Sequence, residues 1–170
     1  MYRCVIEDNS HTAIRLYNSA NLTVNSSRIS ASNYGLRLEG TYVRSLSVIV
    51  ENTEIRGGRY GVWCSGYRLD LYVRNSDLRM TSISCHGVRS CAVQHCTLSS
   101  SHSYQQAITA VNVRTLIIDS NIITNRTSGQ AVDVSGCNSV QVRFSFVLIL
   151  SIDIVSSDSI YLRILFNFLL

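Results

Sequence analysis

The sequence contains no proline and no lysine, so all 15 of its positive charges are arginines. Charged residues make up only 15% of the 170 residues, whereas hydrophobic residues make up 46%. Disordered chains have the opposite balance, with few β-branched residues and much charge or proline. We therefore expect a folded chain that is long enough for one ordinary domain with a sizeable core.

Long apolar runs and clusters of charge are scarce as well. The most apolar stretch, FSFVLIL at 144–150, is much too short to span a bilayer, and Asp153, Asp158 and Arg163 interrupt the chain after it. The net charge of +4 is scattered without a basic cluster. The first ten residues lack the apolar core of a secretory signal. The sequence predicts no membrane and no nucleic-acid partner, and it leaves the cellular compartment open.

What the chain has in abundance is a repeated phrase. NYGLRLEG at 33–40 returns as RYGVWCSG at 59–66. In each copy a small residue precedes an apolar, a variable and an apolar residue, which is the period-two pattern of a short strand with one buried face. Such small residues recur every 20 to 26 residues, as Ala13, Gly35, Gly61, Ser82, Ala107, Ala131 and Ser151.

A second apolar pair and a third apolar anchor follow nearly every copy of the phrase; in the seventh copy Asn167 replaces the anchor. The repeat predicts an all-β fold, a right-handed parallel β-helix (a solenoid) of about seven coils with three short strands each, because one coil alone cannot bury its apolar residues and parallel crossovers are right-handed in about 98% of cases. We expect Gly35 and Gly61 at a tight corner where a side chain would clash. A β-sandwich is the alternative, but its strands would share no repeating phrase.

Strand–turn–strand phrases such as LSVIVENTEI and LDLYVRNSDL make the chain similar to the pectin-lyase-like superfamily over about residues 5–165. The resemblance implies an asparagine ladder at the bend between the second and third strands, where this chain has only two adjacent asparagines. It also implies polysaccharide as the partner, an extracellular or cell-surface location, and Ca²⁺ as the one conceivable cofactor. The ladder position reads Ser26, Asn52, Asn75, His95, Ser120 and Phe144.

Enzymes of that superfamily bind an extended polysaccharide along one outward face, and the outward residues of the first strand are the candidates here. We call this file the stripe. Trp63 would stack on a sugar ring, and Arg15 and Arg37 would hold carboxylates of an acidic glycan. In chain order the stripe reads Arg15, Arg37, Trp63, Ser84, Thr109, Asp133 and Asp153.

Asp133 and Asp153 occupy matching positions of adjacent coils and are the candidate catalytic acids. One strand spacing of ~4.8 Å would bring them close enough to share acid and base roles, as glycoside hydrolysis by a retaining enzyme requires. A solvated or cation-binding aspartate pair is the plainer alternative. No arginine stands in register with Asp133, which argues against a lyase. The sequence leaves open whether the protein is an enzyme, either a hydrolase or a lyase.

A cluster of cysteine and histidine invites a metal interpretation, which the coil register contradicts. The pattern places Cys85 and Cys91 inside different strands, His86 outside and His95 at a bend, and their spacing matches no standard zinc site. Cys64 and Cys85 occupy the same inward position of adjacent coils, where parallel side chains orient poorly for a disulfide. We therefore predict no metal site, and stacked free thiols in the core.

Neither end of the predicted rod has an evident cap. We expect one β-helix domain over residues 1–170, which is part of a longer β-helix or associates end to end or as a homo-oligomer. The function that we predict is association with a polysaccharide, which the stripe binds or also cleaves. A structural or adhesive repeat protein without catalysis is the alternative.

Overall fold

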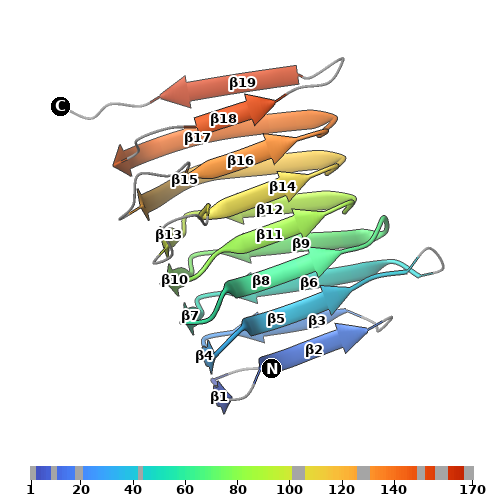
Figure 1. Cartoon of the computed structure of the whole chain (residues 1–170), viewed down its shortest axis with the longest axis vertical. Coiled ribbons are helices and arrows are strands. Elements are labelled where there is room, and N and C mark those ends of the chain that lie inside the picture. The colour runs from blue at the N-terminus through green and yellow to red at the C-terminus, as the bar shows by residue number, and fades with distance from the viewer. Residues whose placement is uncertain are drawn as a thin grey trace.

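The computed structural model describes residues 3–8, 11–17, 21–41, 44–100, 106–125, 131–148, 152–155 and 161–166. Every regular element in this part of the chain is a β-strand, and every strand pair is parallel. Within it we find no helix of the length and apolar character needed to cross a bilayer. The strands stack as successive rungs, so the chain climbs along one axis from β1 to β19 (Figure 1).

The strands form two hydrogen-bonded sheets of 7 and 12 strands. The first strands of the coils make the smaller sheet: β2 (Thr12–Tyr17), β5 (Tyr34–Glu39), β8 (Tyr60–Ser65), β11 (Ile83–His86), β14 (Ile108–Val111), β16 (Val132–Ser135) and β18 (Ile152–Val155). Second strands make seven of the twelve strands of the larger sheet: β3 (Leu22–Asn25), β6 (Leu46–Glu51), β9 (Leu69–Arg74), β12 (Ser90–Gln94), β15 (Thr115–Asn125), β17 (Ser139–Leu148) and β19 (Tyr161–Phe166). Third strands complete it: β1 (Val5–Asp8), β4 (Arg28–Ala31), β7 (Glu54–Arg56), β10 (Asp77–Arg79) and β13 (Thr97–Ser100).

The alternation in the repeated phrase is what buries the core. Leu36, Val62 and Ile83 are register partners on successive first strands, and each is fully buried. The apolar pairs of the second strands and the anchors of the third, such as Ile55, face them from the other two sides. The prediction of an all-β parallel β-helix is confirmed.

The predicted number of coils is slightly too high, since the solenoid has about five complete three-strand turns. Separate third strands follow only the earlier coils. In β15 and β17 the second and third strands run on as one, and the register between them shifts at Asp119/Asn121. A sequence pattern that marks three apolar positions per coil cannot tell a sharp corner from a bulged, continuous strand. Ser151, Ile160 and Asn167 of the seventh predicted coil lie outside the described residues.

The small residue of each phrase sits at the corner where the third strand gives way to the first. A Cβ added to Gly35 would lie 2.6 Å from the carbonyl oxygen of Gly61 and 2.9 Å from Cγ2 of Ile55. Ala107 and Ala131 occupy the same corner higher in the rod and are fully buried. The tight corner expected at the two glycines is therefore present.

The bend between the second and third strands has a repeated backbone geometry. The predicted ladder residues from Ser26 to Ser120 adopt left-handed φ angles near 50°, whereas Phe144 lies within β17 without one. Asn52 and Asn75 are exposed, and the buried polar ladder lies one residue later along the chain. Thr53, for example, donates from Oγ1 to the Glu51 carbonyl (2.8 Å) and accepts from the backbone N–H of Ser27 (3.4 Å). The left-handed residue turns the chain, so that its successor points inward. The buried ladder is Ser27, Thr53, Ser76, Cys96 and Asn121.

Candidate functional site

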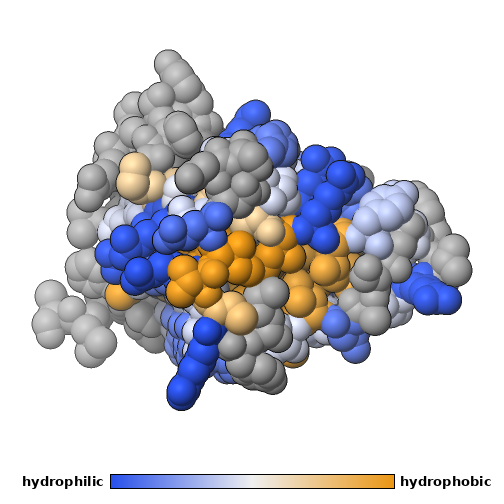
Figure 2. Space-filling view, turned by 90° about the horizontal axis from the view of Figure 1, so that it is seen from below, coloured by the Kyte–Doolittle hydropathy of each residue, from blue (hydrophilic) through white to orange (hydrophobic). Residues whose placement is uncertain are grey.

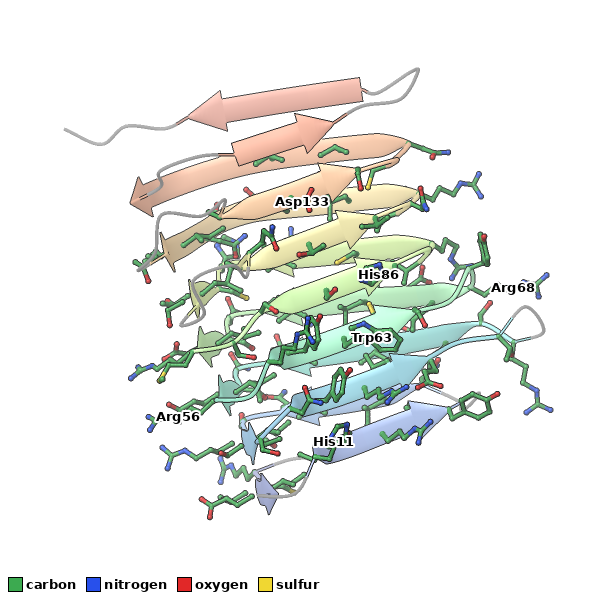
Figure 3. All side chains as sticks on the ribbon, in the orientation of Figure 1. His11, Arg56, Trp63, Arg68, His86 and Asp133 are labelled. Carbon is green, nitrogen blue, oxygen red and sulfur yellow. The ribbon has the colours of Figure 1, made fainter. Side chains whose placement is uncertain are left out.

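The stripe exists as a continuous file of register partners on the 7-stranded sheet. Arg15 pairs with Arg37, Arg37 with Trp63, and the file continues through Ser84 and Thr109 to the two aspartates. Trp63, His86 and Asp133 rise along the same side of the rod in Figure 3. Three strand spacings, or about 14 Å, separate the backbone positions of Trp63 and Asp133.

Trp63 is the centre of a group of rings that the sequence did not lead us to expect; we call this group the aromatic strip. Tyr34 and Tyr60 stack with ring centroids 5.4 Å apart and planes inclined by 16°. The Trp63 ring meets Tyr34 edge-on at 6.2 Å and lies 6.3 Å from His86. His11 contacts Tyr34 at 5.4 Å. The strip therefore runs across four successive coils: His11, Tyr34, Tyr60, Trp63 and His86.

The two predicted arginines lie beside the aromatic strip and share one carboxylate. Nε of Arg37 donates to Oε1 of Glu39 at 2.6 Å, and Nη2 of Arg15 lies 3.5 Å from the same oxygen. The Arg37 guanidinium also lies over Tyr34 and Trp63, 5.3 and 5.4 Å from the ring centroids. A cation between two rings is held in place by the ring quadrupoles. The face thus combines partly exposed rings with a guanidinium pair that already has a counter-ion.

The candidate catalytic acids come from β16 and β18. Asp133 is half-buried, and its backbone is the register partner of Asp153. The side chain of Asp153 lies outside the described ones, so the pair is placed by its backbone alone. Adjacent parallel strands separate the two Cα positions by about 4.8 Å, as the repeat predicted.

Next to Trp63, Ser84 of the stripe makes a hydrogen bond with His86, which stands two residues later on β11. Oγ of Ser84 lies 2.8 Å from Nε2 of His86. The pair has the composition of a nucleophile and its base, but Ser84 is only 2% exposed. We interpret the serine as the group that fixes the orientation of the His86 ring at the end of the aromatic strip.

Five of the six cysteines are buried in the core, Cys4 is partly exposed, and none lies on the stripe. The Sγ atom of Cys85 lies 3.2 Å from that of Cys64 and 2.9 Å from that of Cys91, and none of the six cysteines forms a disulfide in this structure. Burial raises the pKa of Cys64; the contact with Cys64, together with burial, raises the pKa of Cys85 well above 9.0. The predicted stacking of Cys64 and Cys85 in the core is thus confirmed. Within the described residues, no three potential ligands converge as at a metal site.

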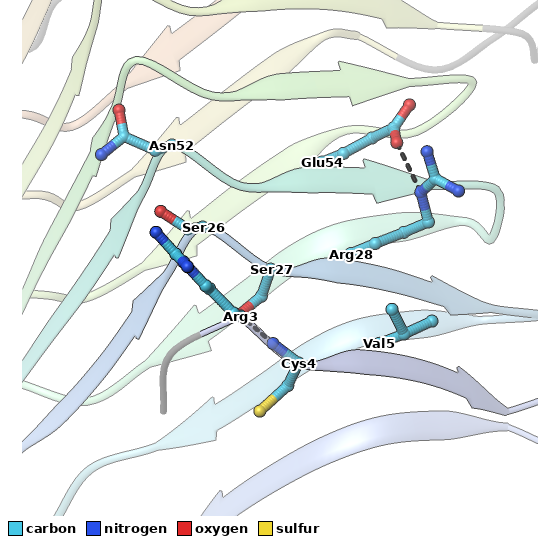
Figure 4. A pocket seen from close by; sticks show the side chains of 8 residues that line it. All are labelled: Arg3, Cys4, Val5, Ser26, Ser27, Arg28, Asn52 and Glu54. Carbon is cyan, nitrogen blue, oxygen red and sulfur yellow. Dashed lines mark hydrogen bonds and ion pairs between the residues drawn. The ribbon is translucent and has the colours of Figure 1, made fainter.

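A hollow of about 410 Å³ opens on a different face, beside the bend below β4 (Figure 4). Arg3, Ser26, Arg28, Asn52 and Glu54 are among the residues that line it. It is remote in the fold from the aromatic strip, which lies on the first strands. A groove beside Trp63 with residues 41–45 as its wall would favour glycan binding, but residues 42 and 43 lie outside the described part of the chain.

The end of the rod that carries β1 and β2 exposes apolar surface between polar margins (Figure 2). Val5 is 69% exposed there, and Ile14, Leu16 and Leu22 are only partly buried against the core. At this end of the rod, β1, β2 and β3 are the outermost strands of their sheets. The predicted end-to-end association would use this surface, and it stays a prediction.

Comparison with protein families supports the architecture. A family model described as a right-handed β-helix region matches residues 1–78. The chain is a parallel β-helix. The strand stack of this β-helix continues in the same register well beyond the matched residues, through β11 to β18. Comparisons with curated proteins and with solved structures give no match. The narrower resemblance to pectin lyases stays a prediction.

Sequence reasoning placed the stripe of this β-helix correctly but missed its neighbours. Tyr34 and Tyr60 open the very phrase that revealed the repeat, so their alignment was visible as YG in both copies. Glu39 stands two residues after Arg37 on the same outward face, which period-two spacing also reveals. The contact of His86 with Ser84 depends on side-chain conformation, and no sequence signal indicates it.

Proposed function

We propose that this β-helix binds an extended glycan along the stripe, with Trp63 as the central stacking ring. The observation that carries the proposal is the aromatic strip, in which partly exposed rings from four coils lie along one sheet face. Sugar rings present apolar C–H faces, and large rigid aromatic side chains are suited to contact such faces at small entropic cost.

The rigidity of the face supports this function. Tyr34, Tyr60, Trp63 and His86 are on strands that are hydrogen-bonded to a neighbouring strand on each side, and Arg37 braces both Tyr34 and Trp63. A platform that is ordered before the ligand arrives loses little conformational entropy on binding. An extended polymer lying along the rod axis would pass from Trp63 toward Asp133, where cleavage would occur if the protein is an enzyme.

A direct test is the binding of Trp63→Ala to a panel of neutral and acidic polysaccharides, followed by calorimetry. We expect at least about a tenfold loss of affinity, as for a central aromatic contact. Tyr72→Ala is the matched control, because Tyr72 is 39% exposed on β9 of the other sheet. Equal losses in the two variants, or none in Trp63→Ala, would refute the proposal.

Catalysis is tested separately by incubating the protein with the same panel, with and without calcium. New reducing ends indicate hydrolysis, and unsaturated products indicate a lyase. If Asp133 and Asp153 are the acids, Asp133→Asn abolishes the products and leaves binding at Trp63 intact. Product formation that survives this substitution would exclude the aspartate pair.

A structural or adhesive rod is the second candidate, and the ion pairs across the rungs favour it. Arg74 of β9 lies 2.9 Å from Glu51 of β6, and Arg28 of β4 lies 2.7 Å from Glu54 of β7. Such pairs contribute only about 0–1 kcal/mol each, so they serve register and solubility better than they serve a ligand. Failure of the protein to bind any polysaccharide of the panel would favour this candidate.

A further inference from the structure

Glu39 occupies a position between the two arginines on which recognition of an acidic glycan would depend. Its register partners are Tyr17 on β2 and Ser65 on β8, so it points outward beside the stripe. One carboxylate oxygen contacts both Arg37 and Arg15. The Glu39 side chain is only 18% exposed, whereas that of Arg15 is 59% exposed. The carboxylate therefore lies beneath the arginine pair and is covered by it.

A carboxylate of a bound glycan would compete with Glu39 for the positive charge of Arg37 and Arg15 and for the N–H groups that Glu39 contacts. Nε of Arg37 donates to Glu39, and the guanidinium carbon lies 5.3 Å from the ring centroid of Tyr34 and 5.4 Å from that of Trp63. Glu39 is tethered two residues away on the same strand, so its effective concentration at Arg37 far exceeds that of a free ligand. An incoming carboxylate must either displace Glu39 from Nε of Arg37 or bind close to it, and in both cases the negative charge of Glu39 would repel the ligand.

From this geometry we infer that Glu39 sets the charge selectivity of the stripe, directing it to neutral glycans by satisfying Arg15 and Arg37 internally. The inference rests on the proposed function, because it concerns the ligand class of the same face. Ring stacking then supplies the recognition, and the arginines hold the rings in place. Glu39 acts through the two arginines and is a positioning residue for them.

The test compares two forms of one polymer that differ only in charge: methyl-esterified homogalacturonan and the same material after saponification. Glu39→Gln retains the size and an acceptor oxygen of the side chain but removes the charge. We expect the wild type to bind the esterified form at least as well as the saponified one. Glu39→Gln gains about tenfold for the saponified form alone, with the affinity falling as salt is raised, because charge-assisted contacts become available.

Glu54→Gln is the matched control, since Glu54 also bridges two arginines, Arg28 and Arg56, on the other sheet. Its side chain is 19% exposed, against 18% for Glu39, and its substitution changes the net charge equally. Circular dichroism at the temperature of the binding assay checks that both variants are fully folded there, so that the comparison concerns binding and not folding.

The outcomes distinguish the inference about Glu39 from an effect of overall charge and from failure of the proposed function. A gain for the saponified polymer in Glu39→Gln alone supports the inference. An equal gain in Glu54→Gln overturns it, because overall charge would then be the cause. A wild type that already prefers the saponified form, with no change in Glu39→Gln, overturns the inference while Trp63-dependent binding survives. Absence of binding to both polymers by the wild type and Glu39→Gln overturns the proposed function itself, and the inference with it.

Discussion

Adding one methyl group at the coil corner should destabilise this protein more than most surface changes could. In Gly35→Ala the new Cβ would lie 2.6 Å from a backbone oxygen of the next coil and 2.9 Å from a core methyl of Ile55. Contacts this short cannot persist, and the oxygen belongs to backbone that is fixed by its own ladder. Either the corner must open or two coils must separate locally.

The expected cost follows from comparable overpacking of well-filled cores. Insertions of this kind cost about 1–3 kcal/mol, and contact with backbone places Gly35→Ala near ~3 kcal/mol. Gly40, in the same phrase, provides the control, because its added Cβ would meet nothing closer than 3.5 Å. Gly40→Ala should stabilise the fold by about 0.5 kcal/mol, since alanine restricts the unfolded chain.

Equilibrium unfolding in urea measures both effects. With a slope of about 2 kcal/mol/M, Gly35→Ala lowers the transition midpoint by about 1.5 M and Gly40→Ala raises it slightly. Similar midpoints for the two alanine variants would refute the reasoning, because they would show that the coil corner is not packed as tightly as the distances indicate.

Two further predictions concern pH. Partial burial works to raise the pKa of Glu54, but the hydrogen bonds from Arg56 and Arg28 outweigh burial and lower that pKa below 4.5. The stability that Glu54 contributes is therefore present above pH 4.5 and lost as the pH falls below 4.5. Urea midpoints of Glu54→Gln should decline less steeply in acid than those of the wild type. Burial raises the pKa of Cys96 from 9.0 to about 11, so its contribution to the free energy of unfolding is present below pH 9.0 and lost as the pH rises toward 11. The urea midpoint of Cys96→Ala should therefore decline less steeply in alkali than that of the wild type, and identical declines would contradict the assignment.

The coil repeat was visible in the sequence because it is enforced at every rung by the same constraint. Leu36 and Leu38 must point inward on any coil of this kind, and Gly35 must be small wherever the corner is tight. The number of complete turns was less predictable. At Ser120 the chain keeps the left-handed φ of the earlier bends, yet the strand continues with a register shift. The spacing of apolar residues is the same for a sharp bend and for a continuous strand with a register shift, so it does not distinguish them.

The predicted position of the polar ladder was wrong by one residue. Asn52 looked like a ladder residue, but its left-handed φ exposes it and turns Thr53 inward. Asn121 is the one buried asparagine of the true ladder, where it donates to the Val93 carbonyl and accepts from the Cys96 N–H. Period-two reasoning fails at such a bend because a left-handed residue breaks the alternation on which it depends.

For the candidate site, sequence reasoning gave the positions of side chains and not their mutual contacts. Arg37 was expected to face a ligand, and its position on the stripe is as predicted. Its engagement with Glu39 and with two rings depends on torsions along a long flexible side chain. Those choices follow from the register of three neighbouring strands together, which no single repeat reveals.

The register of the stripe spaces its residues along the rod by whole multiples of one strand spacing. Because Trp63 and Asp133 stand in one file, duplication or loss of a whole coil between them would move them apart or together by one strand spacing, ~4.8 Å. Every other coil would keep its own core and corner, since each contacts only its neighbours. Tandem duplication of a short gene segment can therefore retune the distance between the two ends of this face without the invention of any new structure.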